Sequence, residues 1–182
     1  IGKDGDDYVP MRPTSNYDEK ERPSTVDWLR TDTLANQCSK IASRLDAQIK
    51  AYPGEFIGIL VPKNDEVDEV WKSLSVTPFA PLVALHKSGE HEGFSADCPI
   101  IVATIHAAKG LEFRSVHIAA CESVKRFRHQ RNMLFTAITR AKTSLSIYHT
   151  GELPGYLQAG LMTLQPITKL PKIDDAFGGG GS

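Results

Sequence analysis

The sequence has few cysteines, no long apolar run and almost no net charge. Its three cysteines, Cys38, Cys98 and Cys121, are widely spaced and odd in number, which argues against a disulfide framework and for a reducing cytoplasm. No apolar run approaches the roughly 20 residues that a membrane-spanning helix needs, so we expect a cytoplasmic protein with no membrane partner. The net charge of −1 argues against a surface coated in positive charge to grip nucleic acid, although it is compatible with a local basic patch.

The composition is that of an ordinary folded domain. The chain has 182 residues, of which 41% are hydrophobic and 24% charged, and this length suits one domain with a substantial core. Residues 1–23 are polar, acidic and interrupted by prolines, which indicates an extended lead-in. The folded domain is expected over residues 24–165, and residues 166–182 form a tail whose GGGGS end resembles an engineered linker. Because the chain starts at Ile1, we expect a piece cut from a longer protein.

Apolar runs and helical patterns alternate along the folded part. From Ser24 a helical pattern begins, with apolar side chains on one helix face between Leu34 and Ile49. Further helices are expected after Asn64, over 129–142 and near 154–161, and strands over 56–61, 81–85, 99–104, 115–121 and 144–148. Because the strands are apolar on both faces, the pattern predicts an α/β fold with a parallel sheet covered by helices on both faces.

One stretch at the end of a predicted strand carries side chains suited to nucleotides. It is TIHAAKGLEF, residues 104–113, and ligands in open α/β sheets bind where strands end. Gly110 and its small neighbours allow a backbone to approach a ligand closely, and Glu112 can accept a hydrogen bond from a sugar hydroxyl. Three side chains offer donors suited to phosphate oxygens: Thr104, His106 and Lys109. On spacing alone, an ordinary strand-to-helix turn with surface charges is an equally good interpretation.

A basic segment over residues 125–142 contains an arginine with two alternative roles. The segment has lysines and arginines but no acidic residue. Arg140 lies near the C-terminus of the predicted helix, where a cation favours the helix dipole. The alternative is an arginine finger, a fixed guanidinium that binds the γ-phosphate of ATP and stabilises charge as the phosphoryl group leaves.

The stretches TIHAAKGLEF (104–113) and RNMLFTAITRAK (131–142) together resemble motifs V and VI of the UvrD/Rep-type superfamily 1 DNA helicases. FIGILVPKN (56–64) resembles motif IV, and the likeness covers roughly residues 24–150. The resemblance implies the second, C-terminal member of two RecA-like domains, which bind ATP in the cleft between them. It implies an ATP-dependent DNA helicase or translocase as the parent protein, with the N-terminal RecA-like domain and single-stranded DNA as partners.

The resemblance also assigns roles by motif position. Arg140 would be the catalytic residue that contacts the γ-phosphate, Glu112 would reach the ribose, and Gly110 would allow close approach. Lys63 stands where many relatives have an arginine that contacts nucleotide, so it is an ATP-binding candidate. Arg131 would face either phosphate or solvent. Three residues would contact DNA or couple it to the nucleotide: Thr104, His106 and Lys109.

The chain lacks the parts that hold most of a nucleotide. No G-x-x-x-x-G-K-[ST] loop occurs in it, so ATP and Mg²⁺ would be bound mainly by the N-terminal domain. We therefore expect the isolated chain to hydrolyse ATP negligibly. The interval between Asn64 and Thr104 is short where larger relatives insert an accessory domain, which favours translocation over unwinding.

Several alternatives stay open at this point. The domain could be a non-catalytic helicase-fold interaction module in a DNA repair or defence assembly, because fold does not guarantee activity. The parent could act on RNA, since phosphate contacts do not separate RNA from DNA. Trp28 and Trp71 could stack on bases, although Trp71 fits a core-facing helix position. No metal site is expected, because the patch of histidine, glutamate and cysteine over residues 86–98 lacks paired ligand spacing.

Overall fold

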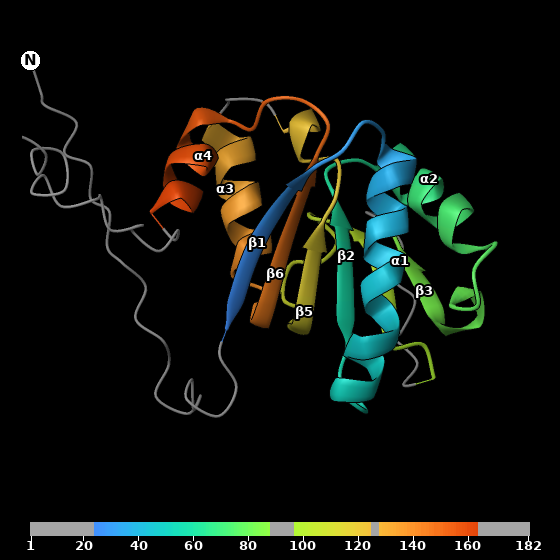
Figure 1. Cartoon of the computed structure of the whole chain (residues 1–182). Helices are drawn as coiled ribbons and strands as arrows, with labels where there is room; N and C mark the ends of the chain where they lie inside the picture. Colours follow the sequence, from blue (N-terminus) through green and yellow to red (C-terminus); the bar gives the residue numbers. More distant parts are fainter. Residues whose placement is uncertain (1–23, 88–96, 125–127, 164–182) are drawn as a thin grey trace, which may run out of the picture.

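The structure is a computed structural model that describes residues 24–87, 97–124 and 128–163 (Figure 1). The expected lead-in, the tail with its GGGGS end and most of the patch over residues 86–98 lie outside the described residues. Within the described part, no helix is both long enough and apolar enough to cross a membrane.

Strands and helices alternate along the described part (Figure 1). The strands are β1 (Thr25–Arg30), β2 (Ile57–Val61), β3 (Val83–His86), β4 (Ile100–Thr104), β5 (Phe113–Ile118) and β6 (Ala141–His149). The helices are α1 (Leu34–Ala51), α2 (Asn64–Leu74), α3 (Arg128–Ile138) and α4 (Gly155–Met162). Two short 3₁₀ turns, η1 (Ala80–Leu82) and η2 (Cys121–Ser123), precede β3 and α3.

The strands form one sheet in the order β1-β6-β5-β2-β4-β3. Every neighbouring pair is parallel, and Ile57 of β2 lies opposite both Ile100 of β4 and Ser115 of β5. Parallel neighbours cannot be joined by a tight hairpin and need crossover connections. In three places along the chain a helix provides the crossover: α1 after β1, α2 after β2 and α3 after β5. The predicted α/β fold with a parallel sheet is confirmed.

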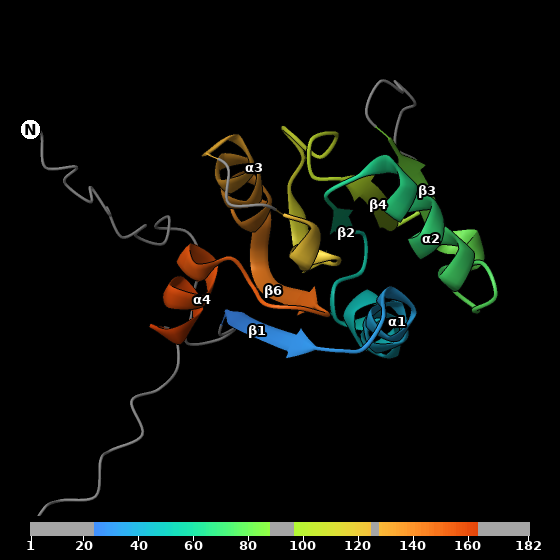
Figure 2. The same cartoon turned by 90° about the horizontal axis from the view of Figure 1, so that it is seen from above.

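Helices cover both faces of the sheet, as predicted (Figure 2). Along β2, Ile57 and Ile59 pack in the cluster that contains the buried side chains of α1 and α2, whereas Leu60 packs in the cluster with α3 and α4. Gly58 lies between Ile57 and Ile59 on β2 and therefore faces the same side of the sheet as Leu60. A Cβ at this position would lie 2.9 Å from the Phe113 ring. The ring therefore fills the space that a side chain would need. All five residues of β2 are buried, which explains its continuous apolar run.

The strands β5 and β6 begin two and three residues earlier than predicted, and two predicted helices differ more. Residues 25–30 form β1 instead of the start of a helix, and α1 begins at Leu34 after Thr33, whose hydroxyl accepts a hydrogen bond from the Asn36 N–H at 3.1 Å. β1 is an edge strand with no fully buried residue, so it lacks the apolar run that marks the central strands. The helix predicted over 129–142 ends at Ile138, because the sheet pairing of β6 begins at residue 141.

Candidate functional site

The parallel sheet has two edges, and each collects different candidate residues. At the N-terminal edge, where the strands begin, Glu112 directly precedes β5 and Arg140 directly precedes β6. At the C-terminal edge, where the strands end, Thr104 closes β4 and Lys63 follows β2. β4 has five residues, and at about 3.3 Å per residue the two edges are roughly 16 Å apart. Glu112 therefore does not lie where a strand ends, the position expected for its stretch, and Arg140 lies in the turn between α3 and β6.

Arg140 is half-buried beside the segment 104–112. Its Nε donates to the Thr136 carbonyl at 3.3 Å, and its Nη1 donates to the Leu111 carbonyl at 3.4 Å. Its own carbonyl accepts a hydrogen bond from the Phe113 N–H at 2.9 Å, which ties the turn to the start of β5. Both guanidinium bonds are longer than the usual N–H···O range, and a guanidinium has five N–H donors. The group can therefore turn toward an anion at this edge without a large loss.

Glu112 and Gly110 flank Leu111 and so lie close to the arginine. Glu112 forms an ion pair with Lys142, Oε2 to Nζ, at 3.0 Å, and the two side chains are 62% and 46% exposed. Exposed pairs of this kind contribute little stability, so the carboxylate can exchange its partner for a hydroxyl group. Gly110 has a φ of 91°, a left-handed conformation that favours glycine, and no heavy atom lies within 4 Å of where a Cβ would be. The N-terminal edge thus brings Gly110, Glu112 and Arg140 together.

The structure does not bring Lys63 or Arg131 to Arg140. Lys63 lies at the C-terminal edge with its Nζ 3.8 Å from Oε1 of Glu66. Burial raises the pKa of Glu66, against hydrogen bonds and the Lys63 charge, which lower it. Arg131 is in the first half of α3, about 10 Å along the helix from its end, with its guanidinium 5.9 Å from the centre of the Tyr156 ring. Neither cation can share a phosphate group with Arg140 within this domain.

Lys63 and His106 are exposed toward the C-terminal edge, and Lys109 is exposed directly before Gly110, on the segment that joins the two edges. Lys63 and His106 follow the neighbouring strands β2 and β4. Thr104 differs from them because it is 2% exposed, and its Oγ1 accepts a hydrogen bond from the Ala107 N–H at 3.1 Å. This burial leaves Thr104 little surface for direct contact with DNA and favours the other role expected for it, which is to couple the DNA contact to the nucleotide site. The threonine instead holds the turn that presents His106.

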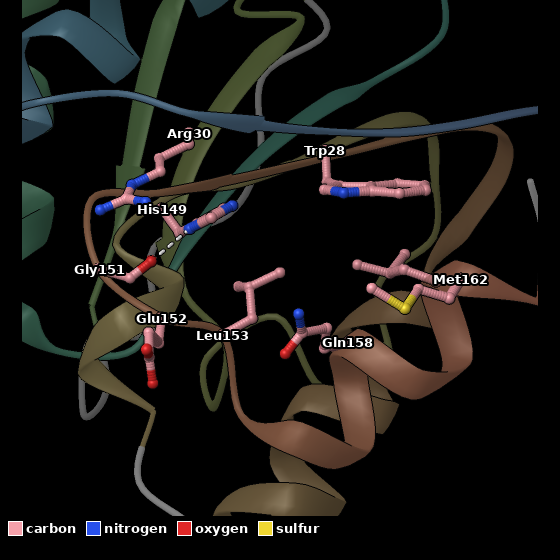
Figure 3. A pocket seen from close by; sticks show the side chains of 9 residues that line it. Trp28, Arg30, His149, Gly151, Glu152, Leu153, Gln158 and Met162 are labelled. Atoms are coloured by element: carbon pink, nitrogen blue, oxygen red, sulfur yellow. Dashed lines mark hydrogen bonds between the residues drawn. The ribbon is translucent and has the colours of Figure 1, made fainter.

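A cavity of about 350 Å³ lies between β1 and α4. In Figure 3 the Trp28 ring covers it from β1, Gln158 and Met162 lie opposite the ring on α4, and Arg30 and His149 lie at the other end. Trp28 is the base-stacking candidate expected from the sequence, whereas the other four residues were not predicted. The available signal was the spacing of Trp28 and Arg30, which puts both side chains on one face of a strand. The mistaken helix over residues 25–30 concealed it.

One buried histidine belongs to neither edge. His117 of β5 is fully buried, with its Nδ1 3.1 Å from the Tyr148 hydroxyl and its Nε2 2.9 Å from Oε1 of Gln48. With the Gln48 oxygen as acceptor, Nε2 carries the proton and the tyrosine donates to Nδ1. Burial, aided by the nearby Arg44 charge, lowers the pKa of His117 to about 3. The neutral ring joins α1 to the sheet and has a structural role.

Residues 99–148 match the family model of the UvrD-like helicase C-terminal domain. This part of the chain is therefore similar to a UvrD-like helicase C-terminal domain. The match includes β4, β5 and most of β6, together with Glu112 and Arg140, and it confirms the resemblance based on motifs V and VI. No curated protein matches the chain significantly in sequence.

Solved helicase and ATPase structures share the fold of this chain. The C-terminal domain of a possible DNA helicase from Lactobacillus plantarum WCFS1 is 21% identical, with a TM-score of 0.56 over 74% of this chain and 78% of that chain. The C-terminal domain of the DEAD-box protein Dbp5 is 7% identical, with a TM-score of 0.53 over 77% of this chain and 83% of that chain. The SWI2/SNF2 ATPase core of Sulfolobus solfataricus, in complex with dsDNA, is 17% identical, with a TM-score of 0.52 over 71% of this chain and 28% of that chain. At these identities the likeness shows the fold alone, which is the RecA-like fold of helicase C-terminal domains.

Proposed function

We propose that this chain is the C-terminal motor domain of an ATP-dependent UvrD-like DNA helicase or translocase. Its N-terminal edge would complete an ATP site whose phosphate loop and Mg²⁺ ligands belong to an N-terminal RecA-like domain. The observation that carries the proposal is the cluster of Gly110, Glu112 and Arg140 at one edge, where a cation, an acceptor and an open backbone lie side by side. Arg140 fits a phosphate, Glu112 fits a ribose hydroxyl, and Gly110 allows the nucleotide to approach the backbone closely.

Arg140 would act when the two domains close. Bound ATP would supply the γ-phosphoryl group, and the guanidinium would exchange its long bonds to the Thr136 and Leu111 carbonyls for charge-assisted bonds to phosphate oxygens. Glu112 would release Lys142 and accept a ribose hydroxyl. Because Leu111 belongs to the segment 104–112, a move of Arg140 is transmitted to the turn that starts at the C-terminal edge. Loss of the γ-phosphate contact would then favour reopening, a ligand-driven population shift.

The C-terminal edge would contact the phosphates of single-stranded DNA. Lys63 and His106 are exposed there, and Lys109 is exposed further along the segment 104–112. Side chains of these types donate to phosphate oxygens without reading sequence. Lys63, which was expected to bind ATP, is included in this proposed group because it lies roughly one strand length from Arg140. Thr104 would support the contact from inside the turn.

A second candidate is a non-catalytic helicase-fold interaction module. One observation favours it: the Arg140 guanidinium already bonds to the Thr136 carbonyl in the last turn of α3, which is the helix-capping role that the sequence left open. In such a module Arg140 would stabilise the turn before β6 and would never meet a phosphate.

A comparison of edge variants in the full-length parent tests the proposal. Glu112→Gln at the N-terminal edge should lower DNA-stimulated ATP hydrolysis and leave affinity for single-stranded DNA within about twofold. The double variant Lys63→Ala/His106→Ala should weaken DNA binding about tenfold and retain ATP hydrolysis at saturating DNA. Lys72→Ala, an exposed lysine of α2, is the matched control. If both sets of variants affect both activities equally, the assignment of separate edges is wrong, and if the parent hydrolyses no ATP, the interaction module is favoured. An RNA strand of the same length, run beside the DNA, identifies the preferred nucleic acid.

A further inference from the structure

We propose that the cavity between β1 and α4 binds one nucleotide unit, with its base stacked on Trp28 and its phosphate on Arg30. The cavity lies outside both groups of candidate residues described above. It has a volume of about 350 Å³, within the range of sites that hold small ligands. A free mononucleotide and one nucleotide of a single strand share the required chemistry.

The spacing of Trp28 and Arg30 fits a base and its phosphate. The two residues are two positions apart on β1, so their side chains leave the same face of the strand about 7 Å from each other. An aromatic ring gives every base a stacking surface, and a guanidinium binds phosphate through paired N–H donors. The Nε of Arg30 donates to the Thr150 carbonyl in a long bond of 3.3 Å, which leaves the remaining N–H donors of the guanidinium for an anion. Among the ion pairs of the described residues, none involves Arg30.

The remaining lining offers polar groups for a base edge and an apolar wall. Gln158 points toward Trp28 in Figure 3, and its amide has both a donor and an acceptor. His149 donates from Nδ1 to the Gly151 carbonyl at 2.7 Å, which leaves Nε2 as the second polar atom of its ring. Leu161 and Met162 line the cavity from α4 and supply apolar contacts opposite the indole. A planar polar ring is the ligand that uses all of these groups together.

The position of the cavity makes a single strand a suitable source of the nucleotide. Arg30 and His149 end β1 and β6 at the C-terminal edge, the same edge at which β4 precedes His106. β1 and β4 are four strand spacings apart in the sheet order, which is about 19 Å at 4.8 Å per spacing. A short strand bound across this edge can reach the cavity. If the nucleotide belongs to a bound single strand, the inference rests on the proposed function. If it is a free mononucleotide, the inference is independent of that function.

The two tryptophans of the chain allow a direct test. In a Trp71→Phe variant Trp28 is the sole tryptophan, and its fluorescence is recorded during titration with thymidine monophosphate, with an oligothymidylate of about ten nucleotides and with inorganic phosphate. We expect saturable quenching by the oligonucleotide, the mononucleotide or both, and none by phosphate alone. Arg30→Ala and Gln158→Ala change exposed side chains and should each weaken that binding by about tenfold, whereas Arg30→Lys should weaken it less and Lys72→Ala should not weaken it.

The outcomes separate this inference from the proposed function. Quenching by the mononucleotide identifies a site for free nucleotides, and quenching by the oligonucleotide alone identifies a site for a single strand. If neither ligand quenches Trp28, or if quenching is unchanged in Arg30→Ala and Gln158→Ala, the inference is wrong. Fluorescence anisotropy can also detect oligonucleotide binding. If that binding is lost in Lys63→Ala/His106→Ala while the Trp28 fluorescence never responds, the proposed DNA contact is supported and the nucleotide site in the cavity is overturned.

Discussion

Replacing His117 by glutamine should remove a large part of the acid sensitivity of the domain. His117 is fully buried between hydrogen bonds from Tyr148 and to Gln48, and its pKa is lowered to about 3. The pKa of a histidine in an unfolded chain is about 6.5. Between these two values the unfolded state binds a proton that the folded state does not bind. The free energy of unfolding therefore falls as the pH falls from about 6.5 toward 3.

The size of this effect follows from the two pKa values. At pH 5 the folded histidine is still neutral, and the unfolded one lies about 1.5 units below its pKa. Each unit corresponds to ~1.36 kcal/mol, so His117 should lower the free energy of unfolding by about 2 kcal/mol between pH 8 and pH 5. Glu66, whose pKa burial raises, acts in the opposite direction, because its folded form takes up a proton more readily. The difference between wild type and variant in the loss of unfolding free energy from pH 8 to pH 5 therefore isolates the contribution of His117.

Urea denaturation of wild type and His117→Gln at the two pH values measures this difference. The variant is expected to be less stable at pH 8, since the ring joins α1 to the sheet, but to lose about 2 kcal/mol less on acidification. His106→Gln, at an exposed position, serves as a control that keeps the wild-type loss. Equal losses in wild type and His117→Gln would show that the ring is protonated in the folded state and would refute the reasoning.

Three further substitutions test the packing. Leu45→Ala removes a side chain of α1 that is 0% exposed and should lower the free energy of unfolding in urea by about 2–5 kcal/mol; a change below about 1 kcal/mol would show that α1 is not docked as described. Gly58→Ala places a Cβ 2.9 Å from the Phe113 ring and should cost about 1–3 kcal/mol, whereas a gain in thermal stability would contradict the contact. Thr33→Ala removes the hydroxyl that accepts the Asn36 N–H and should cost about 1 kcal/mol, and Thr33→Ser should restore most of it.

The central strands were predictable because each is buried on both faces. β2, β4 and β5 are buried almost throughout, and burial on both faces requires the continuous apolar runs that mark them in the sequence. β1 was missed because only one side of an edge strand is paired, and none of its residues is fully buried. Trp28 and Arg30 line the cavity, whereas Asp27 and Leu29 lie toward α1 and its cluster. Its polar positions, such as Asp27, resemble the polar face of a helix when the strand pairing with β6 is not known.

The grouping of the candidate residues needed the three-dimensional structure. Lys63 and Arg140 each belong to a stretch with a nucleotide-binding resemblance, but motif order along a chain does not say at which end of a sheet a residue lies. That depends on the helix α3, which carries the chain back across the sheet and leaves Arg140 at the start of β6. The burial of Thr104 was equally hidden, since a strand-ending threonine can point outward or, as here, close its own turn.

ATP hydrolysis by the full-length parent carrying Arg140→Ala tests the central claim most directly. The claim is that this guanidinium completes a nucleotide site on another domain. We expect DNA-stimulated turnover to fall about a thousandfold or more, with only partial rescue by Arg140→Lys, with unchanged affinity for single-stranded DNA and with a folded domain by circular dichroism. The isolated chain should show no turnover above background. Near wild-type turnover by Arg140→Ala in the parent would contradict the account and leave Arg140 as a helix cap.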